Sequence, residues 1–190
     1  MDLQTVQDTA ATCTLCDLCK NRIKPVFGRG NPDADIVVCG MCPGPDENKI
    51  GLPFVGIAGK ILDGPGGILQ QIFTGETEPS DYVYITNLVK CYVQPGIKLD
   101  KKWMTNCLIY FIAQIHFIRP KVVIGLGGDV CNFLLNNDLK IGQMRGKEYK
   151  YMGAKFIPTY HPSYLVRCGG IKHRHFNIVV EDFRRALNYI

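Results

Sequence analysis

Nine cysteines stand out among the 190 residues, an odd number for a chain whose first residues show no secretory signal. Cys13, Cys16 and Cys19 form two overlapping Cys-x-x-Cys pairs, and Cys91 and Cys107 follow later. Four thiolates can hold a zinc ion or an iron–sulfur cluster in a reducing compartment. The spacing alone leaves the metal open, and it leaves Cys19 as an alternative to Cys13. Buried cysteines that act only as small apolar side chains are the simpler interpretation of the last two.

A turn rich in glycine and proline, residues 40–47, carries a second set of groups that could do chemistry. Its backbone can approach a ligand closely because glycine has no side chain. Asp46 and Glu47 add carboxylates that could act as acid or base, and Phe54 offers an aromatic face shortly afterwards. A solvated acidic turn and a core phenylalanine would explain the same residues.

A third set of groups lies in the segment 160–167, where His161 precedes a proline, a hydroxyl and a guanidinium. Arginine and serine are residue types that contact phosphate, and aliphatic side chains can insert between bases. A basic run follows the segment, although a polar loop before a helix would look similar. The candidate DNA-contacting residues are Ser163, Leu165, Val166, Arg167, Lys172 and Arg174.

Short apolar runs that alternate with helical patterns must position these groups. Buried strands are predicted at 35–40, 82–87 and 121–127, helices at 100–118, 129–136 and 176–187, and a hairpin at 148–160. Gly64–Gly67 should interrupt a helical stretch over 58–73. The pattern predicts a three-layer α/β/α domain around a mostly parallel, four-stranded sheet. Ligand sites in such sheets lie beyond the carboxyl ends of the strands, here at Gly40, Asn87 and Thr159.

The composition is that of an ordinary globular protein, with 46% hydrophobic and 21% charged residues. It argues against long disordered, collagen-like or coiled-coil segments, and no apolar run is long enough to span a bilayer. The net charge of +5 is compatible with a polyanionic partner. We therefore expect one cytoplasmic, monomeric domain over residues 1–190, without membrane contact.

Several motifs follow one another in a characteristic order from about Cys13 to the carboxyl terminus. They are Cys-x-x-Cys, Val26–Pro32, Gly-x-x-Pro-Gly, Gly-x-Pro-Phe-Val-Gly-x-Ala-Gly, Tyr84–Cys91, Arg145–Lys147 and His161–Leu165. Together they resemble family 4 of the uracil-DNA glycosylases, the iron–sulfur type. The resemblance implies an enzyme that flips a nucleotide out of single- or double-stranded DNA and hydrolyses its N-glycosidic bond to leave an abasic site.

The resemblance also implies a cofactor, a four-iron, four-sulfur (4Fe–4S) cluster that is structural in the family and braces a region facing DNA. Its ligand positions match Cys13, Cys16, Cys91 and Cys107, so the first 30 residues would contribute to the site. Cys19 has no family counterpart. The cysteines expected in the core or as bystanders are Cys39, Cys131 and Cys168.

Three residues match positions of the family that handle the flipped base. Phe54 matches the residue that stacks on the base, and Asn87 matches the amide that reads the pyrimidine edge. His161 matches the donor to O2 of the leaving base. The DNA contacts implied are phosphate contacts by Ser163 and Arg167 and a wedge formed by Leu165 with Val166.

Two positions depart from the family pattern, and both lie in the expected base pocket. Met41 stands where members usually have Glu, and Cys42 stands where they have a small residue or, in related branches, a water-holding Asp or Asn. Asp46 and Glu47 are the nearest carboxylates left, and Glu47 matches a position near C5 of uracil. The Gly40-Met41 pair is similar to a single-strand-selective branch that accepts C5 substituents.

Two interpretations follow from these departures. The enzyme either uses a looser water site and removes uracil in base-excision repair, or it takes a C5-substituted pyrimidine such as a modified viral base, in antiviral defence. We favour the second interpretation. The pocket motifs contain no obvious lysine nucleophile, so lyase chemistry is not expected. The alternatives are a non-catalytic DNA-binding or damage-sensing module and a zinc-stabilised α/β protein.

Overall fold

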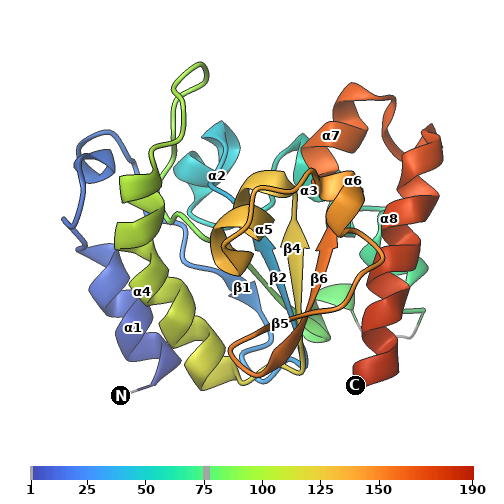
Figure 1. The fold of residues 1–190 in the computed structure, drawn as a ribbon. Coiled ribbons are helices and arrows are strands. Elements are labelled where there is room, and N and C mark those ends of the chain that lie inside the picture. The colour runs from blue at the N-terminus through green and yellow to red at the C-terminus, as the bar shows by residue number, and fades with distance from the viewer. Residues whose placement is uncertain (1, 75–77) are drawn as a thin grey trace.

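A computed structural model describes residues 2–74 and 78–190, and a six-stranded sheet lies at the centre of this part of the chain (Figure 1). The strand order is β1-β3-β2-β4-β6-β5. The four inner strands are parallel: β3 (Val83–Asn87), β2 (Ile36–Gly40), β4 (Val122–Leu126) and β6 (Ala154–Thr159). The two edge strands are short and antiparallel: β1 (Arg29–Gly30) and β5 (Tyr149–Tyr151). The predicted mostly parallel sheet is confirmed, with six strands where four were predicted, and β5 with β6 forms the predicted hairpin.

Helices cover both faces of the sheet, which gives the predicted three layers (Figure 1). One face packs against α4 (Lys101–Ile118), α5 (Gly128–Leu135) and α6 (Ile141–Met144), with α1 (Leu3–Ala11) outside α4. The other face packs against α3 (Ile57–Asp63), α7 (Pro162–Arg167) and α8 (Arg174–Arg184). The remaining helix, α2 (Pro45–Ile50), follows β2 directly. Because both faces are covered, every residue of β2, β3 and β4 is buried.

The helix boundaries follow local signals in the sequence. The Asp100 carboxylate accepts a hydrogen bond from the Lys102 backbone N–H at 2.8 Å and begins α4, which ends at a left-handed Arg119 before a proline. The glycines after Asp63 end α3, and a 3-10 turn over Leu69–Gln71 continues the chain. No helix in the ranges 2–74 and 78–190 is both long and apolar enough to cross a membrane.

Strand register places the expected site residues at one edge of the sheet. Gly40 at the end of β2 pairs with Asn87 at the end of β3, and Leu126 pairs with Thr159 at the ends of β4 and β6. The segments that leave these four strands therefore emerge side by side. This edge is where an open α/β sheet forms its ligand sites.

Candidate active site and cysteine cavity

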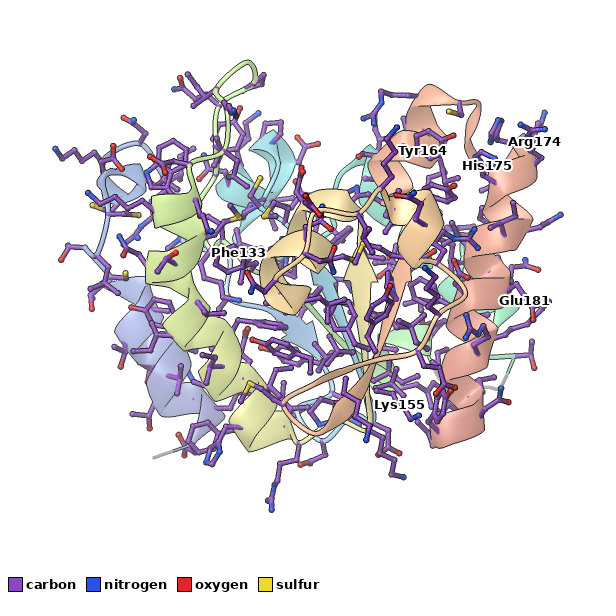
Figure 2. The ribbon with its side chains drawn as sticks, in the orientation of Figure 1. Phe133, Lys155, Tyr164, Arg174, His175 and Glu181 are labelled. Atoms are coloured by element: carbon purple, nitrogen blue, oxygen red, sulfur yellow. The ribbon has the colours of Figure 1, made fainter. Side chains whose placement is uncertain are left out.

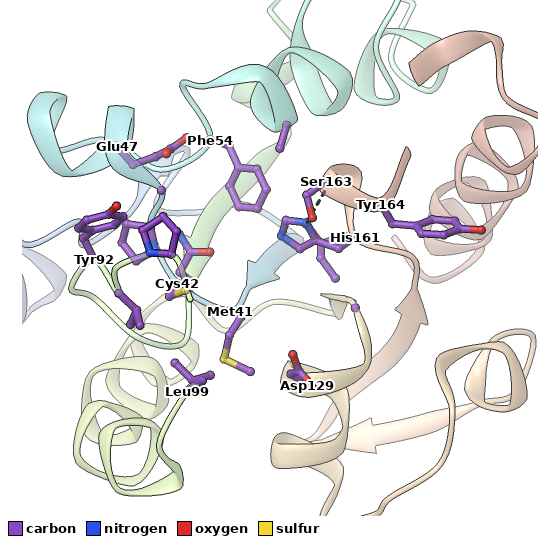
Figure 3. A pocket seen from close by; sticks show the side chains of 18 of the residues that line it. Met41, Cys42, Glu47, Phe54, Tyr92, Leu99, Asp129, His161, Ser163 and Tyr164 are labelled. Carbon is purple, nitrogen blue, oxygen red and sulfur yellow. Dashed lines mark hydrogen bonds between the residues drawn. The ribbon is translucent and has the colours of Figure 1, made fainter. Parts of the chain in front are cut away.

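A cavity of about 770 Å³ opens at this edge of the sheet (Figure 3). Its walls come from the segments 41–47, 92–99, 126–129 and 160–167, together with Phe54 and Asn87. The volume lies within the range of small-molecule pockets. The cavity brings together residues of all four parallel strands or of the segments that follow them.

Asn87 presents an unsatisfied amide to this cavity. Its side chain is 2% exposed, and Oδ1 has no hydrogen-bond partner in the described part of the protein. An unpaired buried polar group costs about 1–3 kcal/mol. Gly40 lies opposite, and a Cβ at that position would collide with the amide oxygen and with the Phe54 ring. The sequence thus leaves space for the amide and keeps it available for a ligand.

Phe54 lies on the other side of the same space, beside His161 (Figure 3). The two ring centroids are 5.7 Å apart with an interplanar angle of 32°. Phe54 has a φ of +55°, which is strained for a bulky residue and is typical of functional sites. Arg29 fixes this conformation, since its guanidinium donates to the carbonyl oxygens of Pro53 at 2.8 Å and Phe54 at 3.3 Å and also pairs with Asp63.

Arg29 was not predicted from the sequence, and its contacts lead to a test. We expect Arg29→Ala to lower the free energy of unfolding by about 1–3 kcal/mol, because two carbonyls and Asp63 lose a partly buried partner. Lys121→Ala removes an exposed ion pair to Asp35 and should cost about 0–1 kcal/mol. Urea unfolding of both variants measures the difference. Equal losses would show that Arg29 does not hold the Phe54 segment.

Glu47 faces the cavity, whereas Asp46 does not. The Glu47 side chain is buried, and its Oε1 accepts hydrogen bonds from the backbone N–H groups of Val55 and Gly56, both at 2.9 Å. Asp46 is exposed on α2 and is not among the residues that line the cavity. The structure thus does not bring Asp46 into the cavity with Glu47, because neighbouring residues of a helix point in different directions, and its catalytic role stays a prediction.

Met41 and Cys42 line the cavity at the positions where the family pattern has other residues. Burial, followed by the nearby carboxylates of Asp129 and Glu47, raises the pKa of the Cys42 thiol to about 11. The thiol is uncharged at neutral pH and is a poor base. Asp129 also lines the cavity, near Met41 in Figure 3, and was missed in the sequence. Asp129 directly follows the two glycines after β4, Gly127 and Gly128. This position after a buried strand is the sequence signal that could have identified Asp129.

His161 lies at the amino end of α7 with one ring nitrogen already occupied. Nδ1 accepts a hydrogen bond from the Ser163 backbone N–H at 3.0 Å, and Ser163 Oγ lies 2.8 Å away (Figure 3). A neutral ring therefore carries its proton on Nε2 and can act as a donor there. Burial, and then the charge of Arg167, lowers the pKa of His161 to about 4. The ring is neutral at physiological pH.

The His161 ring should titrate with a midpoint near pH 4, well below its ordinary 6.5. The folded state then binds fewer protons than the unfolded chain between these values. The contribution of His161 to stability is complete above about pH 6.5 and is lost as the pH falls toward 4. An NMR titration of the ring protons, assigned with His161→Ala, measures the midpoint. A midpoint at or above 6.5 would contradict the buried, neutral ring.

The expected DNA-contacting residues differ in how far the structure exposes them. Leu165, on the inner face of α7, is fully buried in the core, so it would have to move outward to act as the expected wedge, and that role stays a prediction. Val166 is partly exposed, and Arg167 is exposed at the cavity rim. Ser163 contacts His161. Lys172 and Arg174 are exposed beyond α7, and Figure 2 shows Arg174 at the amino end of α8.

A second, smaller cavity collects sulfur atoms. Its walls include Arg22 and Lys90, and the cysteines in its lining are Cys13, Cys16, Cys19, Cys91 and Cys107. The Arg22 guanidinium lies 3.3 Å from the Cys91 sulfur. Within the described residues, no three side chains are arranged to hold a single metal ion. Thiolate sulfur is the ligand type of structural zinc sites and of iron–sulfur clusters alike.

The other predictions about cysteines have mixed outcomes. Cys39 and Cys131 are fully buried in the core on the α4 face, as expected. Cys168 is partly exposed at the carboxyl end of α7. The structure places Cys19 in the sulfur-lined cavity with the four expected ligands, so it does not decide between Cys13 and Cys19.

Comparison with known proteins agrees with this fold and site. The family model of the uracil DNA glycosylase superfamily matches residues 27–184. A type-4 uracil-DNA glycosylase of Thermotoga maritima is 34% identical over 99% of this chain and 94% of its own length. The type-4 enzyme of Sulfurisphaera tokodaii is 33% identical over 96% and 82%, and that of Saccharolobus solfataricus is 34% identical over 97% and 85%.

The fold, the cavity and these matches define a member of the uracil-DNA glycosylase superfamily, which consists of hydrolytic DNA glycosylases. Within the superfamily, the chain belongs to the type-4 uracil-DNA glycosylases.

Proposed function

We propose that this chain removes a flipped-out, non-canonical pyrimidine from DNA by hydrolysis and leaves an abasic site. One observation carries the proposal: the unpartnered Asn87 amide, the Phe54 ring and His161 all line one cavity. The free Oδ1 of Asn87 can accept the N3–H of a uracil-like base, while its amide N–H can donate to O4. Phe54 provides a face on which the base stacks. A mere DNA-binding module has no need of all three.

The chemistry follows from where charge develops. As the N-glycosidic bond breaks, the sugar becomes positive and the base negative at O2. The His161 Nε2–H can donate to that oxygen, and one such donor is worth about 10²–10³ in rate by analogy with oxyanion holes. Because the ring is neutral and Ser163 occupies Nδ1, the donor is oriented before the base arrives. The base leaves as a stabilised anion.

Water is the proposed nucleophile. Among the described residues, no lysine lines the cavity, so no amine is placed to form an imine with the sugar. The carboxylates there are Glu47 and Asp129, and either can hold a water. Attack on an oxocarbenium-like sugar needs little base assistance. The loss of an acidic residue at Met41 is therefore compatible with hydrolysis.

DNA is held by the exposed basic residues around α7 and the start of α8. Arg167, Lys172 and Arg174 supply positive charge beside the cavity, and Val166 is the aliphatic side chain that can approach the base stack. Binding should weaken with salt, with a log–log slope of about −0.9 for each duplex phosphate neutralised. Strand preference does not follow from these contacts.

We further propose that the base carries a substituent at C5, as in modified viral DNA, which would place the enzyme in antiviral defence. Met41 and Cys42 place uncharged side chains in the lining of the cavity, where the family pattern has polar or small ones. Removal of plain uracil in base-excision repair is the other outcome. The alternative is a non-catalytic damage-sensing module, with which Met41 and Cys42 are also compatible.

The cofactor we propose is a 4Fe–4S cluster held by Cys13, Cys16, Cys91 and Cys107, with Cys19 as the alternative to Cys13. When bound, such a cluster is a structural brace. In this proposal residues 1–30 bring part of the ligand set to a single glycosylase domain that spans 1–190. Thiolate ligation suits the reducing cytoplasm, and one basic face is sufficient for a monomer.

A panel of oligonucleotides tests the substrate. It contains uracil, 5-hydroxymethyluracil, 5-hydroxymethylcytosine and glucosylated viral DNA, with alkali cleavage at abasic sites as the measurement and Asn87→Ala as the control. We expect faster release from C5-substituted bases than from uracil. Uracil release at a rate close to that of typical family members would contradict the C5 proposal and place the enzyme in repair. No release from any substrate would favour the damage-sensing module.

A further inference from the structure

Lys90 is a fully enclosed cation between the two cavities. Its side chain is 2% exposed, and it lies between Asn87, the last residue of β3, and Cys91. Its Nζ is 2.8 Å from Thr86 Oγ1, 2.7 Å from Gln114 Oε1 and 2.5 Å from the Asn87 backbone oxygen. An ammonium group has three N–H donors, and three acceptors surround this one.

The neighbouring groups are oriented to receive these three donors. Gln114 donates its amide nitrogen to the Phe27 carbonyl at 2.8 Å, which turns its amide oxygen toward Lys90. The Thr86 hydroxyl also donates to Phe27 at 2.7 Å and so offers a lone pair to Lys90. These three acceptors therefore require a hydrogen-bond donor at the position of Lys90 Nζ. The position of the Asn87 backbone oxygen depends on that donor.

No carboxylate in ranges 2–74 and 78–190 forms an ion pair with Lys90. Burying a lone ammonium is strongly unfavourable, so a counter-charge is expected nearby. Lys90 lines the sulfur-lined cavity, and its backbone N–H hydrogen-bonds the Cys107 sulfur. The rings of Phe27 and Phe111, 5.6 and 6.0 Å away, give only a weak substitute for an anion.

We propose that Lys90 is a positioning residue that couples the cysteine site to the base-reading amide. Its ammonium fixes the backbone of Asn87, and its positive charge adds to that of Arg22 beside the thiolates of the cysteine site. This inference rests on the proposed function, since it assumes thiolates at one end and a base at the other. A disturbance of the cysteine site is then transmitted to Asn87 through one side chain.

The test compares Lys90→Met, which removes charge and donors, with Lys90→Gln, which retains a donor. Val123→Ala, a large-to-small change in the core on β4, controls for general loss of stability. The readouts are iron per chain, the rate at which a chelator bleaches the visible absorbance, and kcat and KM for base release per iron-loaded chain. Unfolding temperatures identify variants of matched stability.

We expect iron loss about 10-fold faster in both Lys90 variants, as for other residues that support metal ligands. Lys90→Met should also reduce kcat about 10-fold with little change in KM, and Lys90→Gln should restore part of that rate. Iron retention and kcat equal to those of Val123→Ala would overturn the proposal for Lys90 alone. Wild-type protein without iron would overturn the proposed cofactor together with the role of Lys90, and wild-type protein that holds iron but releases no base would overturn the proposed function instead. If the methionine variant fails to fold, the glutamine variant decides between these outcomes.

Discussion

Replacing His161 with alanine should slow base release about 10²–10³-fold, with little loss of DNA binding. The partly exposed ring lies at the cavity beside Phe54, and its only free nitrogen is Nε2. The hydrogen bond from this N–H is strongest in the transition state, where negative charge develops on the leaving base. Its loss therefore raises the barrier to bond cleavage more than it weakens binding of the intact DNA. Single-turnover release rates and an equilibrium binding curve separate the two effects.

Ser163→Ala is the matched control for the histidine. The backbone N–H of residue 163 still donates to Nδ1, so the ring keeps the tautomer with Nε2–H. We expect a loss of less than about 10-fold from the missing hydroxyl. A His161→Ala enzyme that releases base at the wild-type rate would contradict the proposed role of the ring, whatever the serine variant does.

Replacing Cys107 with serine should remove most of the bound iron and lower the unfolding temperature. The cavity holds five sulfur atoms and no competing histidine or carboxylate among its lining residues. Burial raises the pKa of the Cys107 thiol to about 11, so a metal centre is needed to keep it as a thiolate. Iron analysis and thermal unfolding of protein purified without oxygen provide the measurement.

The same measurements on Cys13 and Cys19 variants identify which of these two cysteines is a ligand. With Cys13 as a ligand, Cys19→Ser retains about four irons per chain and Cys13→Ser does not. The opposite result would assign the Cys16-x-x-Cys19 pair instead. Zinc in place of iron in the wild-type protein would contradict the cluster and support a zinc-stabilised fold. Cys168→Ser, outside the cavity, is the control for loss of a thiol alone.

The parallel strands could be predicted because their chemistry is local. Three runs of β-branched residues end in glycine or asparagine, and each forms a buried strand within one or two residues of the predicted bounds. Of the two edge strands, β5 falls within the predicted hairpin at 148–160 and pairs with its neighbour β6. Strand β1 is only two residues long, shows no alternation in the sequence and depends on pairing with the distant β3.

The differences in exposure between neighbouring residues of the site come from the direction in which each side chain leaves its helix. In α7, Pro162 and Leu165 are three residues apart and share the buried face, whereas Arg167 points outward. A motif identifies Leu165 but does not say which way it faces. In α2, the same effect buries Glu47 and exposes Asp46. The residue next to a predicted one can therefore be the one that faces the cavity.

Other features depend on contacts between distant segments. Arg29 reaches Pro53, Phe54 and Asp63 only after β1 joins the sheet. Neither the positive φ of Phe54 nor the unpartnered oxygen of Asn87 can be deduced from composition or spacing. The association of the cysteines could be predicted from the resemblance, and the structure brings all five to one cavity.

The central claim is that the Asn87, Phe54 and His161 cavity releases a base by hydrolysis. Incubating excess iron-loaded enzyme with a uracil oligonucleotide and a C5-substituted one, and separating the products by chromatography, tests it directly. The account predicts one free base and one alkali-labile site per DNA strand for at least one substrate, with no protein–DNA adduct. Tight binding of both DNAs without any free base would contradict it.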